Sequence, residues 1–259
     1  MKVLTLDFDG VIADSQMECL FLVSHTYLKF NENTKLFGGQ ALTFDNFDGL
    51  KEKYKETTEK WKSLRPYIVD AFCYYVVLYI IDKNITVSNQ EEFNKIREKL
   101  IPGNYDKCVE HFHDGRYNMQ RGHLREWLKL ETPFRKIIDE IKKLENKYTI
   151  TIATNNKEEL VQVFLDEYGI KPKIITDSTL SSNKIEHLEY IKNKLKADFD
   201  QIYFVDDQVK HFPKLMALGV KCYLATWGYN NEQQIKEAKE HGVTLLDEDN
   251  FYKELTNIS

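Results

Sequence analysis

The chain has 259 residues, of which 42% are hydrophobic and 30% charged, with only 11 glycines and 5 prolines. This composition is typical of a folded globular protein and excludes disordered, collagen-like and linker-dominated chains. The 36 basic and 41 acidic residues give a formal net charge of -5, and no block of like charge is long enough to follow a phosphate backbone, so nucleic acid is not an expected partner.

The chain begins with a short β-rich run and then changes character. Residues 3–6 form a predicted strand that ends abruptly at Asp7-Phe8-Asp9-Gly10. From residue 15 to about 127 no convincing strand pattern follows. Apolar residues recur there at helical spacing, which predicts a helical module. They include Leu20, Val23, Tyr27 and Phe30 and, further along, Trp61, Leu64, Ile68, Phe72 and Tyr75.

After the helical module the pattern alternates between helices and strands. Thr132-Pro133 is typical of an N-cap followed by the first residue of a helix. Strands are predicted at 148–153, 173–176, 202–205 and 221–225, and the helices between them at about 157–168, 185–195 and 209–218. This alternation predicts an α/β core, a Rossmann-like parallel sheet with helices on both faces.

The first strand belongs in that sheet, although the helical module separates it from the others. The helical section is therefore predicted to be an insertion into the α/β core. The expected domains are an α/β core formed by residues 1–14 and 128–259, and a helical domain formed by residues 15–127.

Cysteine usage and apolar runs indicate where the protein resides. Cys19, Cys73, Cys108 and Cys222 are far apart and lack zinc-ligand spacing, which favours a reducing compartment. The longest apolar run, 68–81, is shorter than the roughly 18 to 20 residues of a membrane-spanning helix, so it predicts a buried helix. The apolar stretch at the N-terminus is too short for a secretory signal. We therefore expect a cytoplasmic protein with no membrane partner.

Acidic residues follow two of the predicted strands. Asp7 and Asp9 come directly after the first strand, and Asp206 and Asp207 come after the strand at 202–205. Ligands of an open parallel sheet bind beyond the carboxyl ends of its strands, so these carboxylates can converge. Crowded carboxylates repel one another unless a cation lies among them, and oxygen ligands favour a hard ion such as Mg²⁺. As isolated features, the same acids would be ordinary turn or helix-capping residues.

Cationic and polar residues lie at the same predicted edge. Thr154 and Asn155 follow the strand at 148–153, and Lys184 opens the helix before the strand at 202–205. Together with a metal ion, these groups would attract an anionic phosphoryl group. A carboxylate that faces the phosphorus can then attack it covalently, and Asp7 is the candidate.

The ordered set of motifs resembles that of the haloacid dehalogenase (HAD) superfamily of phosphohydrolases. The resemblance rests on DFDGV at 7–11, IATN at 152–155, Lys184 at the start of a helix and FVDD at 204–207. It covers residues 1–14 and about 128–259. The helical insertion is similar to a C1-type cap, a lid that closes over the cleft and chooses the substrate.

The resemblance implies a role for each motif residue. Asp7 would be the nucleophile and a Mg²⁺ ligand. Asp9 would be the general acid and base, with its backbone carbonyl on the metal. Asp207 would be a direct metal ligand and Asp206 would lie behind it, although adjacent carboxylates can exchange these roles. The phosphate-binding residues would be Gly10, Thr154, Asn155 and Lys184.

Residues of the helical section are candidates for substrate selection, and the sequence does not indicate which of them face the cleft. The candidates are Arg65, Arg116, Arg121 and the tyrosines at 67, 74, 75 and 79. His111 and His113 are expected to be ordinary residues of the helical domain rather than a zinc site.

We therefore predict a Mg²⁺-dependent phosphatase that hydrolyses a small phosphorylated metabolite through an aspartyl-phosphate at Asp7. A phosphomutase, a phosphonate hydrolase that uses a lysine of the helical section, and a non-catalytic phosphate-binding or regulatory protein are the alternatives. Haloacid dehalogenation is disfavoured because it would not need Asp9 together with Asp207. The sequence indicates neither the physiological substrate nor the oligomeric state.

Overall fold

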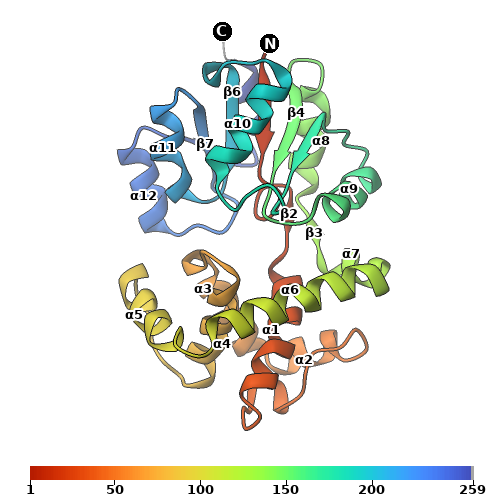
Figure 1. Ribbon diagram of the computed structural model, residues 1–259, viewed down its shortest axis with the longest axis vertical. Helices are drawn as coiled ribbons and strands as arrows, with labels where there is room; N and C mark the ends of the chain where they lie inside the picture. The colour runs from red at the N-terminus through yellow and green to blue at the C-terminus, as the bar shows by residue number, and fades with distance from the viewer. Residues whose placement is uncertain (258–259) are drawn as a thin grey trace. The chain divides into compact units, whose positions relative to one another are not determined.

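The predicted strands come together in one six-stranded parallel sheet, as a computed structural model that describes residues 1–257 shows (Figure 1). The strand order is β5-β4-β1-β6-β7-β8, so the first strand of the chain is central. The strands are β1 (Val3–Leu6), β4 (Thr149–Ala153), β5 (Ile174–Thr176), β6 (Ile202–Asp206), β7 (Lys221–Ala225) and β8 (Thr244–Leu246). Leu6 pairs with Ile152 of β4 and with Val205 of β6, which brings the carboxyl ends of the three strands to the same edge.

Helices connect these strands within the unit formed by residues 1–14 and 132 onward. They are α8 (Arg135–Leu144), α9 (Glu158–Glu167), α10 (Lys184–Leu195), α11 (Phe212–Ala217), α12 (Glu232–Glu240) and α13 (Phe251–Thr256), with short 3-10 turns η3 (Phe199–Gln201) and η4 (Val209–His211). The predicted parallel α/β fold is thereby confirmed. The strand β8 and the helices α12 and α13 were not predicted.

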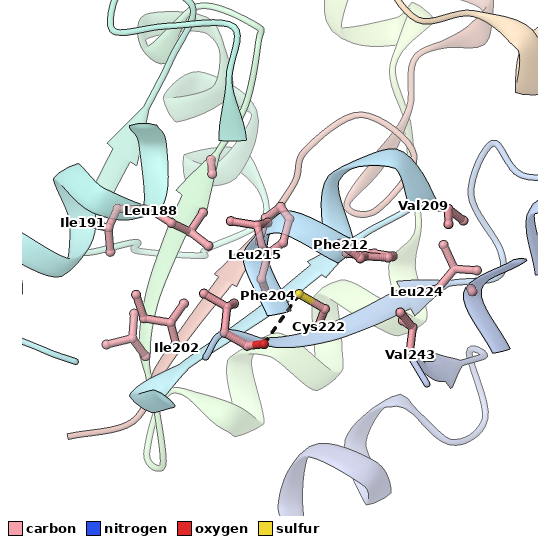
Figure 2. Packing of buried hydrophobic residues seen from close by; sticks show 14 of the residues in the cluster. Leu188, Ile191, Ile202, Phe204, Val209, Phe212, Leu215, Cys222, Leu224 and Val243 are labelled. Atoms are coloured by element: carbon pink, nitrogen blue, oxygen red, sulfur yellow. Dashed lines mark hydrogen bonds between the residues drawn. The ribbon is translucent and has the colours of Figure 1, made fainter. Parts of the chain in front are cut away.

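One face of the sheet packs against α10 and α11. Figure 2 shows this core, in which Ile202, Phe204, Cys222 and Leu224 of the strands meet Leu188 and Ile191 of α10 and Phe212 and Leu215 of α11. The side chains of these residues are at most 6% exposed, so this layer is closed to water. Burial of this apolar surface holds α10 against the sheet, and with it Lys184, the first residue of that helix.

The opposite face of the sheet is covered as well. Leu4, Leu6 and Tyr203 alternate along their strands with the residues of the first face, and all three are buried. Tyr148 lies against Tyr203, with ring centroids 5.2 Å apart, and its hydroxyl donates a hydrogen bond to the carbonyl oxygen of Leu255 in α13. The sheet is therefore the middle of three layers.

A short antiparallel ribbon lies where the chain leaves the α/β unit and returns to it. Its strands are β2 (Ala13–Asp14) and β3 (Thr132–Pro133), with Asp14 opposite Thr132. The prediction of a helix start at Thr132-Pro133 is therefore wrong. Phe134 donates its backbone N–H to the carbonyl of Ile12, and α8 begins only at Arg135. A partner distant in sequence has overridden the local helix-start signal.

The predicted helix at 209–218 is also divided in the structure. The 3-10 turn η4 precedes α11, and Pro213 is the second residue of α11. Proline has no N–H to donate to the carbonyl of Val209, so a continuous α-helix through both segments would lack that bond. The remaining predicted strands and helices start and end within about a residue of their observed bounds.

Residues 15–131 form a second compact unit that is helical. Its elements are α1 (Gln16–Phe30), α2 (Phe47–Lys53), α3 (Lys55–Leu64), α4 (Ala71–Asp82), α5 (Gln90–Leu100), α6 (Tyr105–Gly122) and α7 (Leu124–Leu130), with 3-10 turns η1 (Leu36–Gly38) and η2 (Arg65–Tyr67). Helix α1 packs against α4 and α6. The apolar run at 68–81 corresponds to α4, a buried helix as predicted.

The four cysteines form no disulfide with one another, and all four are buried. Within residues 1–257 no helix combines the length and the apolar character that crossing a bilayer requires.

Candidate active site

Asp7 is the first residue beyond β1, at the centre of the sheet edge. Its backbone N–H continues the pairing with β6 by donating to the carbonyl of Val205. Its carboxylate oxygen Oδ1 accepts a hydrogen bond of 2.7 Å from the backbone N–H of Phe8 and lies 2.9 Å from Nζ of Lys184. The Asp7 side chain is 12% exposed. It is therefore held in one orientation in an enclosed position.

The structure brings Asp7, Asp206 and Asp207 together. One oxygen of each carboxylate lies within 4.8 Å of the others, and all three residues are buried. Asp206 Oδ1 accepts a hydrogen bond from the backbone N–H of Gln208, whereas its Oδ2 has no hydrogen-bond partner among residues 1–257. A buried carboxylate oxygen without a donor is costly, and a hard cation would satisfy it. The three residues therefore fit a Mg²⁺ ion.

Lys184 supplies a positive charge to this cluster. Its Nζ donates to the carbonyl oxygen of Ala153, at 2.5 Å, and pairs with Asp7. The Asn183 side chain caps α10 by accepting the backbone N–H of Ile185, so the helix begins at Lys184. The long side chain thus extends from the start of α10 to the ends of β1 and β4.

The charges of the site are unbalanced without a cation. Burial raises the pKa of the Asp7 carboxyl well above its usual range; Lys184 opposes this shift, and the neighbouring Asp206, Asp207 and Asp9 add to it. Burial disfavours the ammonium form of Lys184, but the charges of Asp7 and Asp206 outweigh that effect and raise its pKa. The cluster therefore holds three buried carboxyl groups and the ammonium group of Lys184. This excess of acidic groups favours the binding of a cation.

Asp9 and Gly10 lie in a tight loop between β1 and β2. The carbonyl of Phe8 accepts the N–H groups of Ile12 and Ala13, which folds residues 8–13 back on themselves. Gly10 has φ +81°, and a Cβ at this position would overlap Oδ2 of Asp207. Glycine is required here both for the backbone conformation and for the close approach to the carboxylate. Asp9 is partly exposed and lies near enough to raise the pKa of Asp7.

The residues after β4 differ in their accessibility. Thr154 is fully buried, and its hydroxyl oxygen accepts the backbone N–H of Asn156. Asn155, which the sequence suggested as a phosphate ligand, has an exposed side chain, whereas Asn156 is buried. The adjacent carbonyl of Ala153 binds Lys184. Lys184 therefore contacts both the end of β4, where this loop begins, and Asp7 of the acidic cluster.

Comparison with known proteins shows the family. A model of the haloacid dehalogenase-like hydrolases matches residues 1–213. The chain belongs to this hydrolase family. The family and the carboxylate site together identify a HAD-type phosphohydrolase, as the sequence predicted. Among curated proteins no match was found.

Solved structures share the fold at low sequence identity. A predicted phosphatase from Clostridium acetobutylicum has a TM-score of 0.62 at 13% identity, with 99% of each chain covered. A predicted phosphoglycolate phosphatase from Haemophilus somnus has a TM-score of 0.60 at 16% identity, with 98% of each chain covered. These hydrolases resemble the chain over both its α/β and helical parts.

In the helical unit of this hydrolase, several suggested substrate contacts serve the unit's own packing. Arg116 donates two hydrogen bonds to the carboxylate of Glu18, of 2.8 and 2.6 Å. The Glu18 side chain is fully buried. Tyr74 is stacked between Trp61 and Phe112. The ring of Tyr75 packs against Tyr27 and Phe72.

Other suggested residues of this unit are placed differently. Arg121 donates a hydrogen bond to the Tyr117 hydroxyl on an exposed part of α6. Arg65 is buried, with its guanidinium 5.4 Å from the Tyr74 ring centroid. His111 lies on α6 with Nδ1 3.0 Å from the hydroxyl of Thr26.

Sequence reasoning missed one segment that contacts the acidic cluster. Trp227, Gly228 and Tyr229 follow β7, and the backbone N–H of Tyr229 donates to Oδ2 of Asp207. Gln208 is nearby, with its amide donating to the Tyr229 carbonyl. A Trp-Gly-Tyr tripeptide one residue beyond a predicted parallel strand was the available signal, because glycine can mark a place where another part of the backbone approaches closely.

Proposed function

We propose that this HAD-type phosphohydrolase is a Mg²⁺-dependent phosphatase that forms an aspartyl-phosphate on Asp7. The observation that carries the proposal is the convergence of Asp7, Asp206 and Asp207 around Lys184 at the carboxyl edge of the sheet. We further propose that the substrate is a small phosphorylated metabolite and that residues 15–127 of the helical unit select it.

Asp7 is the attacking group in this proposal. One of its carboxylate oxygens forms a bond to phosphorus while the bond from phosphorus to the substrate oxygen breaks. The Phe8 N–H and Lys184 hold the other oxygen of Asp7, which keeps the carboxylate oriented during the attack.

Asp9 handles the protons. As a carboxylic acid it gives its proton to the departing substrate oxygen, and as a carboxylate it then removes a proton from water. That water attacks the phosphorus of the aspartyl-phosphate, which releases phosphate and restores the Asp7 carboxylate. Asp9 follows Asp7 by two residues in a loop closed by the Phe8 carbonyl, so both acids can act on the same phosphoryl group.

Lys184 and the loop after β4 would bind the phosphoryl oxygens. The Lys184 ammonium neutralises negative charge on the phosphoryl group, and Thr154, Asn155 and Gly10 would donate hydrogen bonds to it. Asp7, Asp206, Asp207 and the Asp9 carbonyl would hold the Mg²⁺ ion, which when bound screens the charge between the carboxylates and the phosphoryl group.

Labelling the reaction separates the proposed hydrolysis from its alternatives. The purified protein is assayed with a panel of phosphorylated metabolites, with Mg²⁺ or with EDTA, in water enriched in ¹⁸O. We expect phosphate that carries one solvent oxygen, formed only when Mg²⁺ is present. Isomerised sugar phosphate without solvent label would indicate a phosphomutase. Absence of turnover of every phosphomonoester in the panel would contradict an active phosphatase and favour a phosphate-binding role.

Trapping tests the covalent step. Acid quenching during turnover of a substrate labelled in its phosphoryl group should leave label on the wild-type protein and none on Asp7→Asn. Asp139→Asn, which changes an exposed acid on α8, is the matched control and should still be labelled. Label on Asp7→Asn at the wild-type level would place the nucleophile elsewhere.

A further inference from the structure

The loop that follows β7 is bonded to the acidic cluster and to the loop that follows β1. The Tyr229 backbone N–H donates to Oδ2 of Asp207 at 2.7 Å, and the Tyr229 hydroxyl donates to Oδ1 of Asp14 at 3.0 Å. Trp227 Nε1 donates to the carbonyl oxygen of Val11 at 3.1 Å. Two aromatic residues on either side of Gly228 therefore connect the Asp207 carboxylate with residues 11–14.

Gly228 allows this arrangement because it has no side chain. A Cβ at Gly228 would overlap the Cβ of Asp207 and lie 2.5 Å from the carbonyl oxygen of Gly10. Its φ lies outside the positive range, so the requirement for glycine is steric rather than conformational. The segment is thus packed directly between a carboxylate of the acidic cluster and the loop that carries Asp9.

We propose that Trp227-Gly228-Tyr229 is a positioning segment for the metal site. It fixes the Asp207 carboxylate through the Tyr229 N–H and holds residues 10–14 beside it through the Trp227 indole and the Tyr229 hydroxyl. The inference rests on the proposed function, because it assigns these residues a role in Mg²⁺ binding. None of the three is itself a ligand.

The physical reason is the cost of ordering a ligand. A carboxylate that rotates freely loses that freedom when it binds a cation, whereas a donor on one of its oxygens has already fixed its plane. The Tyr229 N–H and the Gln208 amide both reach Oδ2 of Asp207, the latter at 3.4 Å. The Tyr229 side chain is buried, and its hydroxyl is held by Asp14. This fixes the position of the residue and therefore of its backbone N–H, which donates to Asp207.

Two substitutions test the segment at different strengths. Gly228→Ala inserts a methyl group against Asp207, and should raise the dissociation constant for Mg²⁺ at least about tenfold. Tyr229→Phe removes the hydroxyl bond to Asp14 and keeps the backbone N–H on Asp207, so we expect a smaller increase than for Gly228→Ala. Asp14→Ala should also raise the dissociation constant, and the double variant should show less than the sum of the two single effects, because both substitutions remove the bond between Asp14 and Tyr229.

Matched controls separate metal positioning from general loss of stability. Tyr148→Phe removes another buried hydroxyl bond, to the Leu255 carbonyl in α13. Gly49→Ala adds a methyl group in α2, where nothing lies within 4 Å. Both controls should bind Mg²⁺ like the wild type. Binding is measured by isothermal titration of the metal-free proteins with MgCl₂, after circular dichroism has shown that each variant is folded.

A second measurement needs no metal. Hydrogen exchange of the backbone amides of residues 10–14 in EDTA should be faster in Tyr229→Phe than in the wild type and unchanged in Tyr148→Phe. If Gly228→Ala does not fold, Tyr229→Phe alone decides the inference by titration and exchange together.

The outcomes distinguish this inference from the proposed function. Wild-type protein that binds Mg²⁺ and variants that bind it equally tightly, with unchanged exchange at 10–14, would overturn the inference and leave the proposed function intact. Wild-type protein that binds no Mg²⁺ would overturn the proposed metal dependence and the inference with it.

Discussion

Replacing Asp7 by asparagine separates the chemistry of the site from its electrostatics. Asparagine keeps an oxygen that can accept from the Phe8 N–H and from Lys184, but it removes the nucleophile and one negative charge. We expect turnover of 4-nitrophenyl phosphate to fall at least about 10³-fold, because the covalent step is lost. We also expect the metal-free variant to be more stable than the wild type.

The size of the stability gain follows from the distances in the site. Asp206 and Asp207 each have an oxygen within 4.8 Å of an Asp7 oxygen. At an effective dielectric constant of about 20, each repulsion is at least roughly 3.5 kcal/mol, and the attraction between Asp7 and Lys184 at 2.9 Å is about 6 kcal/mol. The two repulsions slightly exceed the attraction, and burial of the Asp7 charge adds to them. A gain on the order of 1 kcal/mol would raise the Tm by roughly 2–4 °C.

The pH dependence has a definite sign. The pKa of Asp7 is raised above its usual value of 3.8 by burial, so the unfolded chain loses this proton before the folded protein does. The stability deficit of the metal-free wild type therefore appears as the pH rises above 3.8 and is complete above the folded pKa. The advantage of Asp7→Asn should be small at pH 4 and larger at pH 8.

Scanning calorimetry in EDTA, at both pH values, measures this advantage, and Asp139→Asn is the control on an exposed acid. Mg²⁺ should raise the Tm of the wild type more than that of Asp7→Asn. A metal-free Asp7→Asn that is less stable than the wild type at pH 8 would refute the electrostatic reasoning. Turnover within tenfold of the wild type would refute the assignment of the nucleophile.

Three further substitutions test other parts of the structure. Lys184→Met should lower kcat by about 10²- to 10³-fold in a steady-state assay, because it removes the buried ammonium that is paired with the Asp7 carboxylate; a wild-type kcat would contradict this. Burial lowers the pKa of His211 to about 4, so the free energy of unfolding should decrease as the pH drops from 6.5 towards 4. Urea denaturation in EDTA should show a smaller decrease of this free energy for His211→Gln than for the wild type. Arg116→Met leaves the buried Glu18 charge without its partner and should cost about 3–5 kcal/mol by urea denaturation, whereas exposed Arg125→Met should cost little.

The candidate site was largely predictable because its residues occupy fixed places relative to strands. Asp7 and Asp207 follow strands whose apolar runs are evident in the sequence, and parallel strands present their carboxyl ends at one edge. The strand β1 was assigned to the sheet although the helical unit separates it from β4, since a lone four-residue strand must pair elsewhere.

The errors occur where a distant partner overrides a local signal. Thr132-Pro133 has the composition of a helix start but pairs with Ala13 and Asp14 as a strand. Arg116 was one of several arginines that looked available for substrate, and its bond to Glu18 depends on how α1 packs against α6. Local composition does not contain such information.

The order of the motifs in the chain was sufficient for the family, the parallel sheet and the acidic residues at its edge, because side-chain chemistry and strand periodicity are local properties. Only the tertiary structure decided that an Asp206 oxygen lacks a hydrogen-bond partner within residues 1–257, that Lys184 lies against Asp7, and that Tyr229 binds Asp207. These relations depend on which backbone groups meet when helices pack on the sheet. Packing is a property of the whole chain, so no single segment specifies it.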